Sequence, residues 1–240
     1  MSELTLSYSK KDMFDACRYR YYLYYIRKAE PTDMVISLLS GSLVHGAIAE
    51  AEQNGKDPLK TYIKLAEAEK GFTDLPEYSL GLDLMNNWQE WKSNRPEDEI
   101  IKGIELPLKI ITPSGIPFVA KMDRLSYIPS KDLWMIIDYK TSRNKVARNK
   151  VKNHWQLNSY ILGLLTQNNV PREKLRAELL YLRDLDTRVI MGEEAEVFAV
   201  EKDIKRTYHE ILKEKIFPRN DRWECRLCEY NSLCHKKGTV

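Results

Sequence analysis

The chain has 240 residues, and its 38 Lys and Arg against 35 Asp and Glu leave a formal charge of only +3. A net charge this small does not favour any class of charged partner. With 43% apolar and 30% charged residues, the composition excludes a disordered chain and predicts one globular domain with a sizeable core.

Three further features bear on the cellular location of the protein. No apolar run approaches the roughly 20 residues that span a bilayer, and the first residues lack the basic-then-apolar order of a signal peptide. The four cysteines are too few for a disulfide scaffold in a chain of this length. We therefore expect a cytoplasmic protein with no membrane contact.

The first part of the chain is predicted to be helical. Ser9-Lys10-Lys11-Asp12 is a capping-box pattern, and the apolar residues after it recur at helical spacing, which predicts a helix over 10–27. Residues 41–53 predict a second helix. Asp57-Pro58 opens a third with an N-cap residue and a proline at the first helical position, and 78–93 continue the helical pattern.

The pattern then changes to strands. Three β-rich runs, separated by Pro-Ser-Gly and Pro-Ser-Lys-Asp turn signals, predict an antiparallel meander over 100–111, 117–128 and 133–141. After them we expect a helix over 149–168, strands over 176–184 and 188–200, a charged helix over 201–215 and a loop-like tail from Phe217. This order predicts an α+β or mixed α/β fold.

Two carboxylates and a lysine occupy neighbouring places in the predicted meander. Asp123 lies in its second strand, and Asp138 and Lys140 end the third on one face, because side chains alternate along a strand. Paired carboxylates bind Mg²⁺ or Mn²⁺, and an ammonium beside them positions water and stabilises charge on phosphorus. The apolar residues 135–137 place this group at the edge of a core, where unpaired charge is costly. Taken alone, an Asp-x-Lys tripeptide is also typical of an ordinary ion pair at a solvated strand end.

Further residues extend this pattern in a fixed order. They are Gly41-Ser42-Leu43-Val44-His45 with Glu50, then Glu105, Lys121-Met122-Asp123-Arg124, Asp138-Tyr139-Lys140 and Gln156-Leu157-Asn158-Ser159-Tyr160. In order and approximate spacing the chain resembles the PD-(D/E)XK nuclease superfamily, and more narrowly the RecB-type exonucleases. The resemblance implies a restriction-endonuclease-like core, with a central mixed sheet flanked by helices.

The resemblance also implies a role for each matching residue. His45, Asp123, Asp138 and the backbone carbonyl of Tyr139 would bind one or two Mg²⁺ or Mn²⁺ ions, and Lys140 would be the catalytic lysine. Gln156 and Tyr160 share a helix face at i and i+4 and would line the site, with Glu105 as an additional acidic residue. From the residues alone, His45 also fits a core histidine, and Glu105 an exposed strand residue.

The chain departs from the superfamily pattern at two positions. The second acid of the Asp-x-Lys unit is Asp138 where glutamate is usual, which shortens its reach by one methylene but keeps its charge. Three residues before Asp123 stands Ala120, where relatives often have glycine. We therefore expect less room for a substrate backbone at that position.

The cysteine spacing indicates a shared metal site. Cys225, Cys228 and Cys234 place three thiols on one short loop, and Cys17 is the one remaining cysteine. Zinc and a 4Fe–4S cluster both accept four thiolates, His235 is a substitute ligand for zinc, and four reduced structural cysteines are the metal-free alternative. The layout resembles that of a RecB-type subgroup that includes CRISPR-adaptation nucleases, the AddAB nuclease domain and phage exonucleases, and this resemblance implies a 4Fe–4S cluster. Its role would be structural, because it would close a loop of about 200 residues.

A basic segment follows the proposed catalytic lysine. It contains five basic residues and no acid: Arg143, Lys145, Arg148, Lys150 and Lys152. Beside a metal site these side chains would bind the phosphate backbone of a nucleic acid. A solvated loop is the alternative, because charge runs are usually exposed.

These features together predict a metal-dependent DNA exonuclease that acts on free or single-stranded ends in recombination, repair or processing, within a prokaryotic or phage-infected cytoplasm. A recombination, helicase or CRISPR-adaptation protein is an expected partner; the chain itself carries no G-x-x-x-x-G-K-S/T motif. The alternative is a non-catalytic or accessory nucleic-acid-binding subunit with a zinc or iron–sulfur site. We expect one nuclease domain over 1–240, with a helical part at 10–95, the catalytic sheet and Q-x-x-x-Y helix at 99–200, and a cysteine loop at 217–235.

Overall fold

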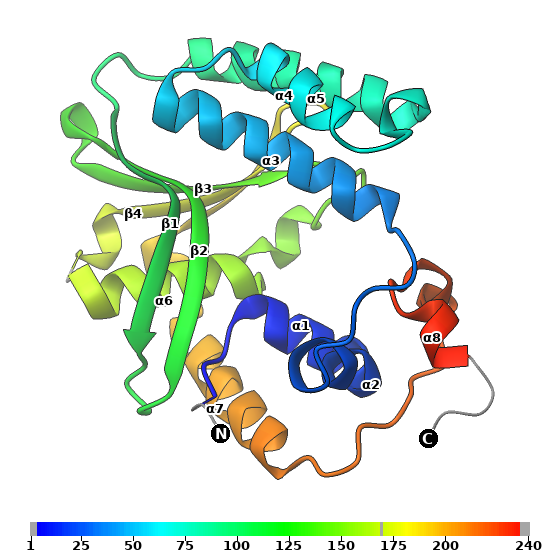
Figure 1. Cartoon of the computed structure of the whole chain (residues 1–240). Helices are drawn as coiled ribbons and strands as arrows, with labels where there is room; N and C mark the ends of the chain where they lie inside the picture. Colours follow the sequence, from blue (N-terminus) through cyan, green and yellow to red (C-terminus); the bar gives the residue numbers. More distant parts are fainter. Residues whose placement is uncertain (1–3, 169, 236–240) are drawn as a thin grey trace.

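A five-stranded mixed sheet forms the centre of the molecule in the computed structural model, which describes residues 4–168 and 170–235 (Figure 1). The strands lie in sequence order as β1 (Ile100–Ile111), β2 (Pro117–Ile128), β3 (Leu133–Lys140), β4 (Leu175–Tyr181) and β5 (Asp186–Met191). The first three form an antiparallel meander, β4 is parallel to β3, and β5 is antiparallel to β4. The predicted meander and the mixed α/β class are therefore confirmed.

Helices cover both faces of this sheet. One face carries α3 (Ile36–Asn54), α4 (Pro58–Glu67) and α5 (Pro76–Ser93), and the other carries α1 (Tyr8–Ala16), α6 (Trp155–Asn168) and α7 (Val197–Lys213). The connection from β3 to β4 runs through α6, as a parallel pair requires a crossover. The shorter helical elements are α2 (Arg18–Tyr21), the π-turn η1 (Tyr22–Ile26), η2 (Phe72–Asp74), η3 (Pro129–Lys131), η4 (Arg148–Asn153), η5 (Arg172–Lys174), η6 (Gly192–Glu194), η7 (Trp223–Leu227) and α8 (Asn231–His235).

Each face of the sheet packs into its own hydrophobic core. Along β3, Ile136 points toward the core under α6, while Met135, Ile137 and Tyr139 point toward the core under α3–α5. Burial on both faces explains why this strand is a continuous apolar run rather than an alternating one. Asp138 lies two residues after Ile136 on the strand, so its side chain is on the same face and points toward α6.

The side chains of β2 change faces at Asp123. Met122 lies in the core under α6, yet Arg124, two residues further on, contacts Glu52 of α3. Regular alternation would put Met122 and Arg124 on one face. The irregularity brings Asp123 to the boundary between the two layers, where the predicted site residues meet.

The first predicted helix needs two corrections. It is not continuous over 10–27, because Cys17 adopts an extended conformation with φ −159° and ψ 113° that separates α1 from α2. The predicted cap is also wrong: the N-cap of α1 is Ser7, whose side chain accepts a hydrogen bond from the Lys10 amide at 3.2 Å. Cys17 therefore does not belong to the apolar face of the single helix that the spacing of apolar residues predicted over 10–27.

Other boundaries shift while the predicted element remains. The predicted helix over 149–168 begins only at Trp155, because residues 148–153 form the 3₁₀ turns of η4. The predicted strand over 188–200 is wrong beyond Met191, where η6 and then α7 follow. Asp57 caps α4 as expected, accepting from the Lys60 amide at 2.9 Å. None of the helices in residues 4–168 and 170–235 is both long and apolar enough to cross a membrane.

Candidate functional site

The predicted site residues converge from five elements. α3 contributes His45, β1 contributes Glu105, and β2 contributes Asp123. β3 adds Asp138 and Lys140, and α6 adds Gln156 and Tyr160. The site thus lies where the two long strands, the central strand and one helix from each layer come together.

Three of these residues form a compact ligand group. His45, Glu105 and Asp123 each place one potential ligand atom within 4.8 Å of the other two. His45 Nδ1 lies 3.5 Å from Asp123 Oδ1, and Glu105 forms an ion pair with Lys121 at the exposed edge. An imidazole nitrogen and two carboxylates are donors that divalent ions such as Mg²⁺ and Mn²⁺ accept.

Glu105 reaches this group through an unusual backbone conformation. Its φ is 52°, in the left-handed region, although it lies within β1 and is not a glycine. The flanking pairs Ile104 with Arg124 and Leu106 with Met122 put Glu105 opposite Asp123. Such a conformation costs of order 1–3 kcal/mol and is typical of functional sites. The strain therefore lies at the point where two acids face each other.

The protonation of this group reflects crowding of like charges. Burial raises the pKa of Asp123, and the neighbouring charge of Asp138 raises it further. Burial lowers the pKa of His45, but the hydrogen bond and charge of Asp123, with Asp138 and Glu105, outweigh burial and raise it overall. Acids held this close are stabilised by a cation, so the residues present fit a divalent metal ion.

A closed ring of polar contacts adjoins the ligand group. Lys140 Nζ lies 2.6 Å from Asp138 Oδ2 and donates to Gln156 Oε1 at 2.9 Å. Gln156 Nε2 donates to the Tyr160 hydroxyl at 2.8 Å, and that hydroxyl lies 2.9 Å from Asp138 Oδ1 and 2.9 Å from the Lys121 carbonyl. Each of the four side chains touches two others, so the ring fixes the Lys140 ammonium in one position.

The environment keeps the two proton-bearing members of the ring protonated. Burial lowers the pKa of Lys140, but the charge and hydrogen bond of Asp138 outweigh it and the pKa is raised overall. Burial, with the charges of Asp138 and Asp123, raises the pKa of Tyr160 well above its ordinary value. Lys140 is therefore an ammonium and Tyr160 a neutral phenol at neutral pH.

The contacts of Asp138 and Tyr139 differ from those expected of the predicted metal ligands. Asp138 is engaged by Lys140 and Tyr160, and it is Glu105 that joins His45 and Asp123 in the compact group. The Tyr139 amide donates to Asp123 Oδ2 at 2.7 Å and so orients that carboxylate. The roles of Asp138 and of the Tyr139 carbonyl as ligands stay predictions.

An ion-pair network behind the site was missed in the sequence. Arg124, 2% exposed, pairs with Glu52 of α3 and, at 2.8 Å, with Glu99 just before β1. Glu99 also binds Arg95 at 2.7 Å and the Ser126 hydroxyl at 2.6 Å. The network ties α3, β1 and β2, which carry His45, Glu105 and Asp123. The one sign of it in the sequence is Arg124, a charged residue among the apolar residues of the predicted second strand.

The basic segment is divided by the structure into two parts. Lys145 pairs with Asp184 and, at 3.2 Å, with Asp186, and Arg148 pairs with Asp186 at 2.7 Å. Arg143, Lys150 and Lys152 are exposed and form no ion pair with any residue that the structure describes. Only these three of the five predicted residues present an uncompensated charge to solvent.

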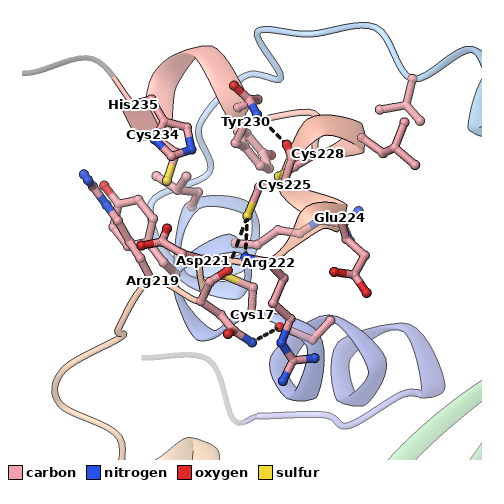
Figure 2. A pocket seen from close by; sticks show the side chains of 18 of the residues that line it. Cys17, Arg219, Asp221, Arg222, Glu224, Cys225, Cys228, Tyr230, Cys234 and His235 are labelled. Carbon is pink, nitrogen blue, oxygen red and sulfur yellow. Dashed lines mark hydrogen bonds between the residues drawn. The ribbon is translucent and has the colours of Figure 1, made fainter.

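The four cysteines line one cavity of about 330 Å³, formed by α2, η7, α8 and the start of α3 (Figure 2). We call this region the cysteine module. Cys225 Sγ donates to the Asn220 carbonyl at 3.3 Å and lies 3.5 Å from the Arg222 amide. Burial raises the pKa of Cys228 and of Cys234. Cys17, in the N-terminal part of the chain, and Cys234, in the C-terminal part, thus line the same cavity.

Two kinds of known proteins are similar to this chain, one a solved structure and the other a protein family. A solved structure described as "Crystal structure of SSO0001" is similar over 86% of this chain and 99% of that one, with 14% sequence identity and a TM-score of 0.34. No curated protein matches the chain. A family model matches residues 5–235, nearly the whole described region and every residue of the ligand group, the ring and the four cysteines. This match implies metal-dependent nuclease chemistry, and the chain belongs to the PD-(D/E)XK nuclease superfamily.

Proposed function

We propose that the protein is a metal-dependent DNA exonuclease that hydrolyses phosphodiester bonds at free or single-stranded ends. The observation that carries the proposal is the closed ring of Lys140, Asp138, Gln156 and Tyr160 beside the group His45, Glu105 and Asp123. A preference for ends is supported by the sequence resemblance to RecB-type exonucleases.

His45, Glu105 and Asp123 would hold a divalent ion, with Asp138 as a further proposed ligand. When bound, the ion supplies positive charge that stabilises the negative charge developing on the phosphate oxygens. The Tyr139 amide keeps Asp123 in a fixed orientation at 2.7 Å. Preorganised ligands of this kind need little rearrangement during the reaction.

The other side chains act on the nucleophile and the phosphate. Lys140 would hold the attacking water by hydrogen bonding and balance the negative charge that develops on the phosphate oxygens in an in-line displacement. Gln156 fixes the lysine side chain, and Tyr160 fixes Asp138, so the relative position of ammonium and carboxylate does not depend on the substrate. Arg143, Lys150 and Lys152, exposed beyond the end of β3, would bind the phosphate backbone.

Degradation of end-labelled linear and closed circular DNA in Mn²⁺ or Mg²⁺ tests the proposal. We expect metal-dependent loss of linear DNA only. Lys140→Ala removes the ammonium and lowers the cleavage rate by about 10²–10³-fold, the range for loss of one preorganised donor. Asp138→Ala abolishes cleavage but leaves DNA binding largely intact.

A matched variant controls for general damage. Lys109 is exposed on β1, away from the ring, so Lys109→Ala keeps wild-type cleavage. Equal loss of cleavage and binding in Asp138→Ala contradicts the assigned roles. DNA binding without cleavage in the wild type and in both variants favours the accessory-subunit alternative.

We also propose that the cysteine module holds a 4Fe–4S cluster. Around a single zinc ion, Zn–S bonds of about 2.3 Å bring all sulfur atoms within roughly 3.8 Å of one another. Among the described residues, no three cysteines place their sulfur atoms within even 4.8 Å of one another. The thiols instead border a cavity of about 330 Å³, which favours a larger occupant than one ion.

Chemical analysis of protein purified without air separates the two occupants. We expect about four iron atoms and as many inorganic sulfides per chain, together with a brown colour. Stoichiometric zinc with no iron in a colourless, stable protein contradicts the cluster. Recombination, helicase and CRISPR-adaptation proteins remain the proposed partners, and co-purification from a host in which the protein occurs naturally would identify them.

A further inference from the structure

Two arginines border a cavity of about 200 Å³ at the edge of the sheet, between η4 and β5. Among the described residues, two charged and three uncharged ones line it: Arg148, Val151, Thr187, Arg188 and Val189. Concave sites on which positive charge converges are typical of anion binding. The mechanism proposed above uses none of these residues.

The guanidinium of Arg188 is held in place by the protein and still has free donors. Only 8% of Arg188 is exposed; its Nε donates to the Val146 carbonyl at 2.6 Å, and its Nη1 donates to the Thr187 carbonyl at 2.9 Å. Nη1 also lies 2.7 Å from Asp186 Oδ2. No residue in 4–168 or 170–235 accepts a hydrogen bond from Nη2. A guanidinium has five N–H groups, so the two on Nη2 remain for a ligand.

Cations outnumber carboxylates around this cavity. Asp186 contacts three of them, Arg188 at 2.7 Å, Arg148 at 2.7 Å and Lys145 at 3.2 Å. Lys145 also pairs with Asp184. Three cations thus share two carboxylates, and the third cation, Arg188, lies outside the basic segment of the sequence. The group as a whole carries one positive charge in excess, which an anion in the cavity would balance.

The cavity is open to a ligand as large as a nucleic-acid strand. The side chain of Arg148 is 76% exposed, so the cavity can be reached from solvent on that side. Arg148 contacts Asp186 through Nη2 alone, which leaves most of its donors free as well. One fixed guanidinium on the inner side and one mobile guanidinium on the outer side therefore face the same space.

Strand register places this cavity on the same face of the sheet as the proposed catalytic ring, the ring of four side chains that includes Asp138. Asp138 pairs with Leu179 of β4, and Leu179 pairs with Arg188 of β5. Paired residues on neighbouring strands point to one face, here the α6 face, and Val151 of the cavity packs on the core under α6. Neighbouring strands lie about 4.8 Å apart, so the backbones of Asp138 and Arg188 are separated by about 10 Å.

We propose that Arg148 and Arg188 bind a phosphodiester of the substrate strand close to the scissile bond. The inference rests on the proposed nuclease function and adds a site that lies outside the metal ligands and the exposed basic residues. A phosphodiester offers anionic acceptor oxygens and no donor, which matches two guanidinium groups. A nucleobase is a poorer match, because its edges carry donors as well as acceptors and the arginines offer donors only.

A cycle of paired changes in protein and DNA tests the contact. Single-stranded oligonucleotides with one neutral methylphosphonate, moved one linkage at a time along the strand, are bound to the wild type, Arg148→Ala and Arg188→Met. Fluorescence anisotropy measures the affinity in Ca²⁺ without Mg²⁺ or Mn²⁺. Each variant should bind unmodified DNA roughly 10–100-fold more weakly, the range for loss of one hydrogen bond to a charged group. Arg148 is exposed, so Arg148→Ala decides the question if Arg188→Met does not fold.

The modification pattern distinguishes a direct contact from a general effect of charge. At one linkage, the methylphosphonate should weaken binding by the wild type and bring wild type and variant to nearly equal affinity, because both changes remove the same contact. Loss by the same factor at every linkage, or no loss in either variant, overturns the proposal.

Arg206→Ala is the matched control. Arg206 is likewise exposed and pairs with two acids, Asp203 and Glu210, but it lies on α7. The control should bind DNA like the wild type. A loss equal to that of Arg148→Ala attributes the effect to net charge and overturns the subsite.

The readout also separates this inference from the nuclease activity, because binding does not require cleavage. Selective loss at one linkage in a protein that degrades no DNA in Mn²⁺ supports the subsite and contradicts the exonuclease. Cleavage by the wild type together with unchanged binding by the variants supports the exonuclease and overturns the subsite. A wild type that does not bind DNA contradicts both.

Discussion

The ring of Lys140, Asp138, Gln156 and Tyr160 and the cysteine module differ in what holds their side chains in place. In the ring, every polar side chain touches two others, drawn from β3 and α6. In the module, four thiols border a cavity, and the neighbouring Trp223 and Leu227 are 71% and 63% exposed. The contacts within the ring therefore organise it without a ligand, whereas the proposed cluster would organise the module.

Hydrogen bonds and one ion pair join residues 218–232, the C-terminal part of the module, to residues 16–33. The Tyr230 hydroxyl donates to the Ala29 carbonyl at 3.0 Å, and Arg20 pairs with Glu229 at 2.8 Å. The thiols of Cys228 and Cys234, whose pKa values burial raises, must also lose their protons to bind a metal. We therefore expect the two regions to respond to different perturbations.

We expect the largest effect from a substitution of Cys228, which should affect the cysteine module and leave the sheet unchanged. Cys228→Ser removes one of the four proposed cluster ligands. We expect it to lose nearly all iron and to open residues 217–235 to protease, because a cluster would no longer stabilise the folded module. The sheet, with its own two cores, should remain resistant. Iron analysis and limited proteolysis measure both. If residues 217–235 of the iron-free variant resist protease as the sheet does, the cysteine module does not depend on an occupant and the proposed difference between the regions is wrong.

The second effect concerns the network behind the metal ligands. Arg124→Met leaves the fully buried side chain of Glu52 with Lys92, at 2.8 Å, as its remaining cationic partner and removes one of the two arginines that pair with Glu99. Loss of one member of a buried ion pair costs about 3–5 kcal/mol. Urea unfolding measures the loss. Replacing Glu52 by Met as well should restore part of the stability, and Lys109→Met on the exposed side of β1 should change it by less than about 0.5 kcal/mol. Additive losses in the double variant would show that the pair is not coupled.

The same network predicts how stability depends on pH. Burial raises the pKa of Glu99, but its hydrogen bonds to Arg95 and Ser126 and the charges of Arg124 and Arg95 lower it to about 2, below its ordinary 4.5. A folded-state pKa below the unfolded one stabilises the fold above about pH 4.5, and this stabilisation is lost as pH falls toward 2. We expect a loss of about 2 kcal/mol, measured by urea unfolding from pH 6 to 2. Glu99→Gln should flatten this dependence; an unchanged slope would exclude Glu99 as its origin.

The smallest effect tests how closely α6 packs on β1. A Cβ on Gly163 would lie 1.8 Å from Leu108 Cδ2, in the core under α6. Gly163→Ala should therefore destabilise the fold by about 1–2 kcal/mol and disturb the helix that carries Gln156 and Tyr160. Gly46→Ala on α3, whose Cβ would meet Leu65 at an ordinary 3.4 Å, should stabilise by up to about 1 kcal/mol. Thermal melting compares the two; equal shifts would contradict close packing at Gly163.

The sheet could be predicted well because its signals are local. The bounds of β1 and β2 match the predicted runs, since proline and glycine turns delimit them and β-branched residues fill them. The ring could also be predicted, because Asp138 and Lys140 lie on one face of a strand and Gln156 and Tyr160 share a helix face. These relations depend only on the periods of strand and helix.

What depends on irregular backbone could not be predicted. The face change at Asp123 and the left-handed Glu105 opposite it leave no mark in residue spacing, so the place of Glu105 in the compact ligand group was not expected. The break of α1 at Cys17 was hidden for the same reason, because the apolar spacing continues through it. Partners distant in sequence, such as Arg124 and Glu52, need the fold itself.

The position of Cys17 and Cys234 at opposite ends of the described chain has a consequence for biosynthesis. The sheet and both of its cores can form as soon as β5 and α7 have been synthesised, but the cysteine module must wait until Cys234 has left the ribosome. Iron delivery would then be the last step of maturation, acting on a protein that is otherwise folded. A cell short of iron would accumulate chains with an assembled catalytic ring and an open module, and proteases would be able to distinguish them from the finished protein by that one region.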